Sequence, residues 1–236
     1  MKPRILDLFC GAGGAAVGYH RAGFEVVGVD IATQPRYPFN FYRDDAVRLL
    51  GRMIRSSGWG VIELDQFDAI HASPPCQRYS TATKRNGTQD GHPDLIGPIR
   101  DLLEVTDLPY VIENVVGAPL IDPVLVCGTE RSCEIDGYRL RRHRHFELGF
   151  PHDAFPGCRC DEAERPVLDV TGGGPTFAPR QDGGGGRPFK GTADQARAIM
   201  GMPWATKAEL NEAIPPVYTE LVGHQLMQHV QVRAVA

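Results

Sequence analysis

The sequence lacks a run of about 18 consecutive apolar residues, the length that a membrane-spanning helix needs, so no membrane span is expected. It contains no internal repeat, which argues against a repeat architecture. The stretch MKPRILDLFCGAGG at the amino terminus has only a short apolar run before its glycines, so it predicts a first strand and not a signal peptide. From these absences we expect a protein of the cytoplasm.

The sequence also lacks a strong excess of charge of either sign. The formal net charge is −4 and the isoelectric point is near 6.1, a weak argument against nucleic acid because local charge matters more than the sum. The segment YRLRRHRHF is strongly basic, and a smaller basic group follows Cys76. The basic residues are Arg139, Arg141, Arg142 and Arg144 in the first group and Arg78, Lys84 and Arg85 in the second. The acidic average therefore leaves a nucleic-acid partner open.

Signs of secretion are missing as well, although the chain has six cysteines. A chain of 236 residues is long for a small disulfide-stabilised secreted protein, so we expect reduced thiols. With 42% hydrophobic and 23% charged residues, the composition suits one medium-sized domain, alone or with a small appendage.

Short apolar segments alternate with amphipathic ones along much of the chain. The predicted strands are residues 3–9, 24–30, 67–73 and 109–115. The predicted helices are residues 15–23, 44–57, 95–108, 192–203 and 215–232. This alternation predicts an α/β fold with a doubly wound, mostly parallel sheet that helices cover on both faces. We expect the final helix to pack back against the first strands and to complete a ligand pocket.

The character of the sequence changes after residue 149. Residues 151–190 are rich in proline and glycine, with glycine runs at Gly172–Gly174 and Gly183–Gly186. A disordered linker is one interpretation, but about forty residues is long for a linker inside a compact chain. We therefore predict one catalytic domain, formed by residues 1–149 and 191–236, with a small irregular insert at residues 150–190.

The motif DLFCGAGG stands where the first strand meets the first helix. Gly11, Gly13 and Gly14 let the backbone approach a ligand closely, and Asp30 ends the second strand, where it can accept hydrogen bonds from ribose hydroxyls. The alternatives are a site for NAD, a site for a nucleotide, or a tight turn that binds no ligand. The spacing is GxGG and not GxGxxG, which favours a nucleoside cofactor without phosphates.

The motif HASPPCQRYS follows a predicted strand. Its two prolines stiffen the loop that holds Cys76, because each fixes a φ angle and removes a backbone donor. Glu113 and Asn114 end the next predicted strand, so in a parallel sheet they would lie at the same edge as the thiol and the glycine turn. A thiolate and a carboxyl group beside a nucleoside cofactor suggest covalent catalysis on an electrophilic ring. An inert thiol beneath a tight turn is the alternative.

Four motifs in this order, DLFCGAGG, SPPCQ, ENV and RRHRHF, resemble those of the cytosine-C5 DNA methyltransferases. The resemblance covers roughly residues 4–149 and 195–236, and it is nearest to compact forms carried by actinobacterial phages. It implies a Rossmann-like class I methyltransferase fold that binds S-adenosyl-L-methionine and releases S-adenosyl-L-homocysteine. The implied partner is double-stranded DNA and the implied location is the cytoplasm of a bacterial cell. We expect a monomer.

The resemblance also implies roles for the residues of these motifs. Cys76 would attack C6 of a flipped-out cytosine, which makes C5 nucleophilic toward the methyl group. Glu113, accompanied by Asn114, would hold the N3 and N4 edge of the base and supply a proton. Arg144 would contact the carbonyl oxygen of the ring, and Arg142 would help to position the catalytic loop.

The implied cofactor contacts lie in several segments. They are Phe9, Gly11, Gly13, Asp30, Asp45, Pro75 and His224. Asp45, which fits the family pattern better than Asp44, would meet the adenine amino group, with a helix N-cap as its alternative role. His224 stands where the family has asparagine, which raises the hypothesis of an acidic variant of the cofactor. Leu140 stands where the family has glutamine, so one contact of the catalytic loop is expected to be missing.

Two alternative functions remain open from the sequence. One is a tRNA cytosine-C5 methyltransferase, since one branch of the family acts on RNA, and the other is an inactive relative that binds DNA. His152, Cys158 and Cys160 could offer a metal site, but CxC is poor spacing for zinc and no fourth ligand is obvious. We therefore predict no metal, with Cys10 packed in the core and Cys127 and Cys133 as ordinary thiols.

Overall fold

The computed structural model describes residues 2–55, 62–80, 83, 86–130, 133–160, 167–170 and 191–235. The predicted basic residues Lys84 and Arg85 and both glycine runs of the insert lie outside this part of the chain. No helix in the described ranges is long and apolar enough to cross a membrane.

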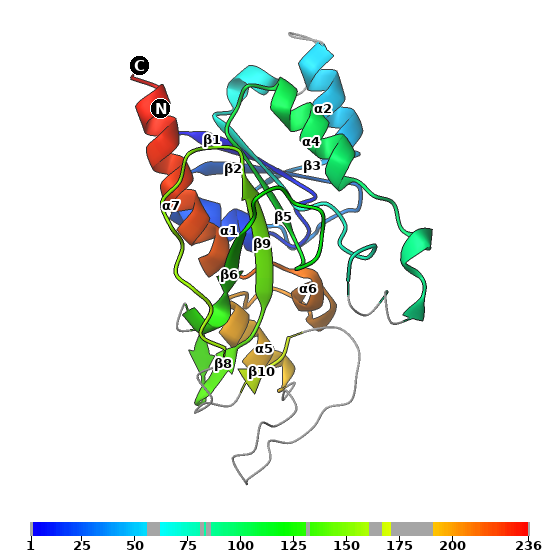
Figure 1. The fold of residues 1–236 in the computed structure, drawn as a ribbon, viewed down its shortest axis with the longest axis vertical. Coiled ribbons are helices and arrows are strands. Elements are labelled where there is room, and N and C mark those ends of the chain that lie inside the picture. The colour runs from blue at the N-terminus through cyan, green and yellow to red at the C-terminus, as the bar shows by residue number, and fades with distance from the viewer. Residues whose placement is uncertain are drawn as a thin grey trace.

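The molecule is built on a seven-stranded sheet (Figure 1) with the strand order β3-β2-β1-β4-β5-β9-β6. The strands are β1 (Arg4–Leu8), β2 (Glu25–Asp30), β3 (Asn40–Arg43), β4 (Ala69–Ala72), β5 (Tyr110–Asn114), β6 (Val124–Cys127) and β9 (His143–Leu148). The first five are parallel, whereas β9 runs antiparallel to both β5 and β6. The predicted mostly parallel sheet is confirmed.

Helices cover both faces of this sheet, as the alternation predicted. One face carries α1 (Gly14–Arg21) and α7 (Pro216–Arg233), and the other carries α2 (Ala46–Arg55) and α4 (Ile96–Val105) (Figure 1). The central strands are buried on both faces and consist mainly of Val, Ile, Leu and Ala, the composition expected of a sheet between two helical layers. The doubly wound α/β fold is therefore confirmed.

The helices α1 and α7 lie in close contact because the residues between them are small. A Cβ added to Gly18 would come within 2.1 Å of the Pro216 carbonyl oxygen. Beside it, the Thr219 hydroxyl donates a hydrogen bond of 2.9 Å to the Ala15 carbonyl. The predicted packing of the last helix near the first strands is thus correct, since Tyr218 and Leu226 share a core with Ile5 of β1.

A smaller three-stranded sheet lies beyond the main sheet. Its strands are β7 (Glu134–Ile135), β8 (Tyr138–Leu140) and β10 (Val167–Leu168), in the order β10-β8-β7. It packs with α5 (Ala193–Met200), and α6 (Lys207–Glu212) follows that helix. Leu140 is fully buried in this second core, which gives a packing reason for an apolar side chain at the position where the resemblance led us to expect glutamine.

Candidate active site

A cavity of about 330 Å³ opens at the carboxyl ends of β1, β2, β4 and β5. The strand order reverses between β1 and β4, and ligands of open α/β sheets bind outside the strand ends at such a point. The lining includes Asp7, Phe9, Gly11, Asp30, Ser73, Pro75, Cys76, Glu113, Arg144 and Glu209. The sequence-predicted cofactor turn and the predicted nucleophile therefore share one cavity.

The glycine-rich turn after β1 bends by left-handed backbone conformations. Phe9, Gly11 and Gly13 have φ angles of 59°, 49° and 84°. At Gly13 a Cβ would come within 2.6 Å of the Pro38 ring, so glycine is required there by both space and φ. Asp30 accepts hydrogen bonds from Gly11 N at 3.0 Å and Ala32 N at 2.9 Å, which fixes the carboxylate at the cavity wall.

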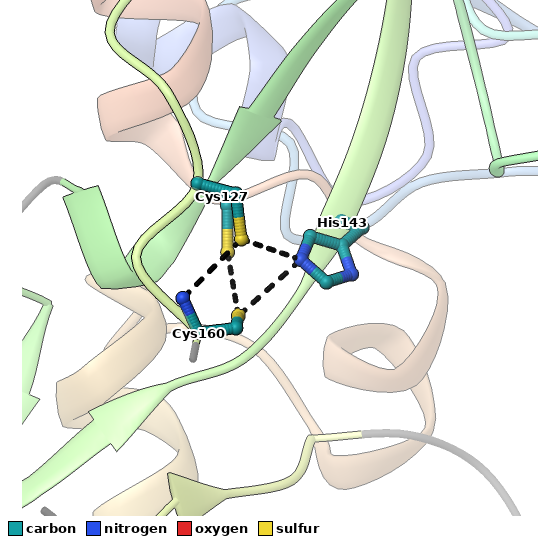
Figure 2. Close-up of side chains that lie close together, drawn as sticks. Cys127, His143 and Cys160 are labelled. Carbon is teal, nitrogen blue, oxygen red and sulfur yellow. Dashed lines mark hydrogen bonds between the residues drawn. The ribbon is translucent and has the colours of Figure 1, made fainter. Parts of the chain in front are cut away.

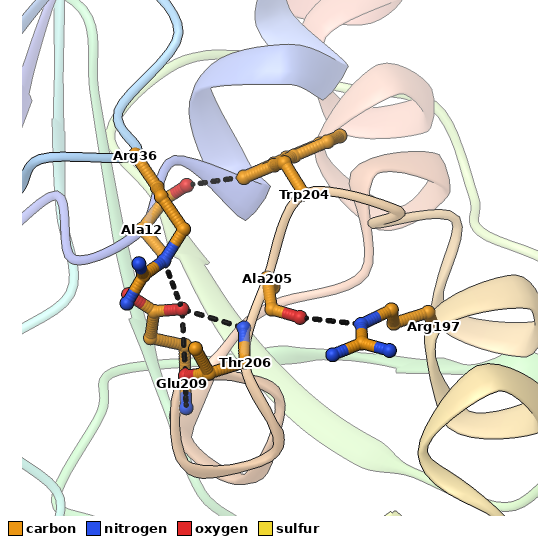
Figure 3. Close-up of polar contacts among 7 residues, drawn as sticks. All are labelled: Ala12, Arg36, Arg197, Trp204, Ala205, Thr206 and Glu209. Carbon is orange, nitrogen blue, oxygen red and sulfur yellow. Dashed lines mark hydrogen bonds and ion pairs between the residues drawn. The ribbon is translucent and has the colours of Figure 1, made fainter.

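A segment that the sequence did not connect with the cavity contributes Glu209, Ala213 and Ile214 to its lining. Figure 3 shows the polar contacts of this segment. The Trp204 indole donates a hydrogen bond of 2.8 Å to the carbonyl oxygen of Ala12, inside the glycine-rich turn. Glu209 lines the cavity, and its carboxylate accepts hydrogen bonds from Arg36 Nε at 3.0 Å and from Thr206 N at 2.6 Å. The Trp204 bond attaches the loop before α6 to the glycine-rich turn, and the Glu209 pair attaches α6 to Arg36, between β2 and β3.

This finding corrects the expectation that the final helix completes the pocket. Ala213 and Ile214, which precede α7, line the cavity, whereas α7 itself packs on α1. His224 is exposed on α7 and is absent from the cavity lining, so the structure does not bring it to the predicted cofactor contact. The hypothesis of an acidic cofactor variant loses its geometric basis.

Asp45 is likewise absent from the cavity lining. Its carboxylate accepts a hydrogen bond of 3.0 Å from Arg48 N, at the start of α2. This is the contact of a helix N-cap, the alternative that the sequence left open for this residue. The structure therefore does not support an adenine contact from Asp45.

The loop after β4 holds Cys76 half-buried at the cavity. The Cys76 carbonyl accepts hydrogen bonds of 3.0 Å from Tyr79 N and Ser80 N, which closes a tight turn. Asn114 donates a hydrogen bond of 2.9 Å from its amide to the Pro74 carbonyl. The predicted partner of Glu113 thus attaches the end of β5 to the proline pair and does not face the cavity.

Glu113 and Arg144 form a buried ion pair beside the thiol. Arg144 Nε lies 2.9 Å from Glu113 Oε1, and only 12% and 7% of the two side chains are exposed. The geometry of this contact is not that of a hydrogen bond. Glu113 Oε1 therefore accepts no hydrogen bond from the residues described. Burial raises the pKa of Glu113, and Arg144 and Arg142 counteract part of that rise. A buried carboxyl with a spare acceptor can hold and protonate a bound ring.

Burial also raises the pKa of the Cys76 thiol. Arg144 lowers this pKa, Glu113 raises it further, and Arg142 lowers it. At neutral pH the thiol is therefore protonated, and the two guanidinium groups are the features that favour its thiolate.

Arg142 is buried next to the site but is absent from the cavity lining. Its guanidinium donates hydrogen bonds to the carbonyl of Val170 and, at 2.8 Å, to that of Asn211. Its own carbonyl accepts a hydrogen bond of 2.6 Å from the Tyr218 hydroxyl. Arg142 therefore connects the start of β9 to α7 and to the second core. None of these three contacts reaches the loop of Cys76, so a role of Arg142 in positioning that loop stays a prediction.

A chain of buried polar groups leads to Glu113 from beneath the sheet. The Tyr19 hydroxyl lies 2.9 Å from His71 Nδ1, and His71 Nε2 lies 2.6 Å from the Ser73 hydroxyl. Ser73 in turn hydrogen-bonds Glu113. Burial lowers the pKa of His71 to about 3, so this imidazole stays neutral. The sequence analysis missed His71 and Ser73, although both belong to the motif HASPPC.

Comparison with known proteins places this site in a family. The model of the C-5 cytosine-specific DNA methylase family matches residues 3–119. The type II methyltransferase M.FnuDI of Fusobacterium nucleatum is 31% identical over 117 residues, which are 48% of this chain and 33% of that protein. M.AquIA of Picosynechococcus is 29% identical over 124 residues, half of either chain. The chain thus spans a third to a half of the length of these curated relatives.

Solved structures extend the likeness in fold over nearly the whole chain. A protein described as a DNA modification methyltransferase encoded within a prophage of E. coli superposes with a TM-score of 0.58 at 15% identity, covering 97% of this chain and 99% of that one. A DNMT2 variant of Spodoptera frugiperda gives a TM-score of 0.57 at 16% identity, covering 95% and 99%. Through its residues 3–119, with the glycine turn, Cys76 and Glu113, the chain belongs to the C-5 cytosine-specific DNA methylase family.

Proposed function

We propose that this protein is a DNA cytosine-C5 methyltransferase that uses S-adenosyl-L-methionine. The observation that carries the proposal is the meeting of Cys76, Glu113 and Arg144 in the cavity that the glycine-rich turn and Asp30 also line. The match of the family model to residues 3–119 supports the same activity.

The cavity suits a nucleoside cofactor that carries no phosphate. Asp30 offers a carboxylate to ribose hydroxyls, Phe9 and Pro75 offer apolar surface, and the glycine turn admits a ligand close to the backbone. A phosphate would meet the carboxylates of Asp30 and Glu209 on this wall. When bound, the cofactor supplies an electrophilic methyl group for a carbon nucleophile.

The residues of the chain supply the rest of the chemistry. The Cys76 sulfur forms a bond to C6 of cytosine while its proton leaves, and the electron pair of the C5–C6 double bond shifts into the ring. Glu113 protonates or hydrogen-bonds N3 as negative charge builds there, and Arg144 stabilises the ring carbonyl oxygen. After methylation, loss of the C5 proton restores the double bond and expels the thiolate.

The cytosine has to leave its base stack to reach Cys76, since the thiol lies half-buried inside the loop. We propose double-stranded DNA as the substrate and a monomer as the active form. The predicted insert would recognise the target sequence, and of that insert residues 150–160 and 167–170 belong to the described structure.

Transfer of labelled methyl groups from S-adenosyl-L-methionine to duplex DNA and to tRNA tests the proposal. We expect incorporation into DNA and its loss, by about a thousandfold or more, in Cys76→Ala, because the covalent step has no substitute. Cys133→Ser serves as the matched control and should retain activity. Incorporation only into tRNA would show that tRNA, and not DNA, is the substrate. Undiminished activity of Cys76→Ala would refute the mechanism. Bisulfite sequencing of DNA from expressing cells would identify the target sequence.

A further inference from the structure

Three thiols and one imidazole converge at the edge of the main sheet, apart from the cavity. The ligand atoms of Cys127, His143, Cys158 and Cys160 all lie within 4.8 Å of one another. Figure 2 shows Cys127, His143 and Cys160 turned toward one another from β6, from β9 and from the segment after β9. None of these four residues has a part in the proposed methyl transfer.

The sheet register brings the first two groups together. Cys127 ends β6 and His143 begins β9, and the two residues stand directly opposite each other in the antiparallel pair. Side chains of directly opposed residues share one face, and neighbouring side chains along a strand alternate between faces. His143 therefore points toward Cys127, while Arg144 points to the other face, where Glu113 lies.

The chain returns to the same point after β9. His143 Nε2 lies 3.1 Å from Cys158 Sγ and 3.3 Å from Cys160 Sγ, and Cys127 Sγ lies 3.5 Å from Cys160 Sγ. Ligands around one tetrahedral zinc ion, at bond lengths of about 2.0 to 2.3 Å, are separated by roughly 3.5 to 3.8 Å. These three pairs are thus slightly closer than, or as close as, the ligands of one zinc ion, and the other pairs lie within 4.8 Å, so small shifts of the side chains would admit the metal.

Polar groups around the sulfurs suit thiolate ligands. The Thr129 hydroxyl lies 3.2 Å from Cys127 Sγ and 3.6 Å from Cys160 Sγ, and the Cys160 amide donates to Cys158 Sγ at 3.4 Å. Such outer hydrogen bonds orient the ligands of a metal and spread the charge of its thiolates. All four positions are protein ligands, the arrangement of a structural zinc site and not of a catalytic one, which keeps a position open.

We propose that Cys127, His143, Cys158 and Cys160 bind one structural zinc ion. Binding releases the three thiol protons to solvent and leaves a centre with a net charge of −1. The ion fastens the first part of the predicted insert to the start of β9, the strand that carries Arg144. This ligand set differs from the one that the sequence suggested, because it lacks His152. The His152 ring instead lies between Phe150 and Phe155, and its Nδ1 lies 3.0 Å from the Asp153 carbonyl oxygen.

The metal content of the purified full-length protein, measured by mass spectrometry of the elements, tests the site directly. We expect about one zinc per chain, and cobalt(II) added to zinc-free protein should give the absorption of a tetrahedral thiolate complex. Zinc at background level in reduced protein that was offered zinc would overturn the proposal. A disulfide in its place, seen as a mass lower by two hydrogens, would overturn it as well.

Variants separate metal binding from simple disruption of the fold. Cys158 is exposed, so Cys158→Ser leaves no core cavity, and it should lower zinc affinity by about tenfold or more. Cys158→His keeps a fourth ligand and should retain the metal. The matched controls are Cys133→Ser and His152→Asn, which should both keep one zinc per chain. Unchanged zinc affinity of both the Cys158→Ser and the His143→Asn variants, measured against a competing chelator, would contradict the assignment. None of these outcomes depends on methyltransferase activity.

Discussion

At the scale of single residues, Cys76 shows how a buried site can hold a reactive thiol in its unreactive form. Removal from water favours the neutral thiol, and Arg144 and Arg142 only partly counteract this. Because the thiolate is the nucleophile, alkylation of Cys76 by iodoacetamide should rise with pH up to a pKa above that of an ordinary cysteine. Mass spectrometry of the Cys76 peptide measures this rate against pH.

The same measurement tests the contribution of Arg144. In Arg144→Ala the thiol loses a favourable cation and still faces Glu113, so its pKa should rise and alkylation near neutral pH should slow by several-fold. Arg141→Ala is the matched control, because Arg141 is exposed in the same segment. Equal alkylation rates in the Arg144→Ala and Arg141→Ala variants would refute this role for the guanidinium group.

At the scale of elements, the contact between α1 and α7 depends on the absence of a side chain at Gly18. A methyl group there would overlap the Pro216 carbonyl at 2.1 Å, so Gly18→Ala should destabilise the protein by about 1 to 3 kcal/mol. At Gly51 in α2 a Cβ would meet only the flexible end of the Arg55 side chain, at 3.2 Å, so Gly51→Ala should stabilise that helix by up to about 1 kcal/mol. Urea unfolding of both variants compares the two effects. Equal free energies of unfolding would show that the close contact between α1 and α7 does not require glycine at position 18.

The loop before α6 is the other element whose attachment can be tested. Trp204→Phe keeps most of the apolar ring but removes the hydrogen bond to the Ala12 carbonyl. Because Ala12 belongs to the cofactor turn, we expect binding of S-adenosyl-L-homocysteine to weaken by about three- to tenfold, from a bond worth about 1 kcal/mol. Titration calorimetry measures this affinity, with His224→Asn as a control that should bind like the unaltered protein. Unchanged binding in Trp204→Phe would mean that this bond does not shape the cavity.

At the scale of the whole molecule, buried titrating groups set how stability depends on pH. Burial raises the pKa of Asp7 to about 8, so from about pH 4 to 8 the folded state holds a proton that the unfolded chain has lost. The contribution of Asp7 to stability therefore falls as pH rises through this window, and the contribution of Glu113 changes in the same direction. The neutral His71 has the opposite effect between its folded pKa of about 3 and its ordinary pKa of 6.5.

The effects of Asp7 and His71 on stability oppose each other below pH 6.5. Above pH 6.5 the decrease in stability due to Asp7 remains, at up to about 1.4 kcal/mol per pH unit. In Asp7→Asn the amide imitates the protonated carboxyl, so the free energy of unfolding should become flatter between pH 6.5 and 8. Denaturant unfolding at several pH values tests this, with the exposed Asp101→Asn as control. An equally steep fall in Asp7→Asn would show that the buried carboxyl is not its source.

Much of the fold was predictable because parallel strands between helices have an unmistakable local pattern. The four predicted strands and all five predicted helices are present. The strand β3 was missed because it is short and half-exposed, and the reversal of β9 has no local signal. In the site, motif residues such as Cys76 and Glu113 came together as expected. Trp204 and Glu209 were missed because their approach to the cavity depends on tertiary packing alone.

The direction of β9 has a consequence for how the length of this chain can vary. The strand is hydrogen-bonded on both sides, to β5 and to β6, so one extra residue inside it would turn Arg144 away from Glu113 and His143 away from Cys127. In the part of the chain that the structure describes, the loop from Pro151 to Gly157 forms no strand, and Asp153 N donates a hydrogen bond of 2.7 Å to Gln225 of α7. Beyond this loop, Cys158 and Cys160 belong to the proposed zinc site. Insertions and deletions should therefore be tolerated better in that loop than within the six residues before Gly149.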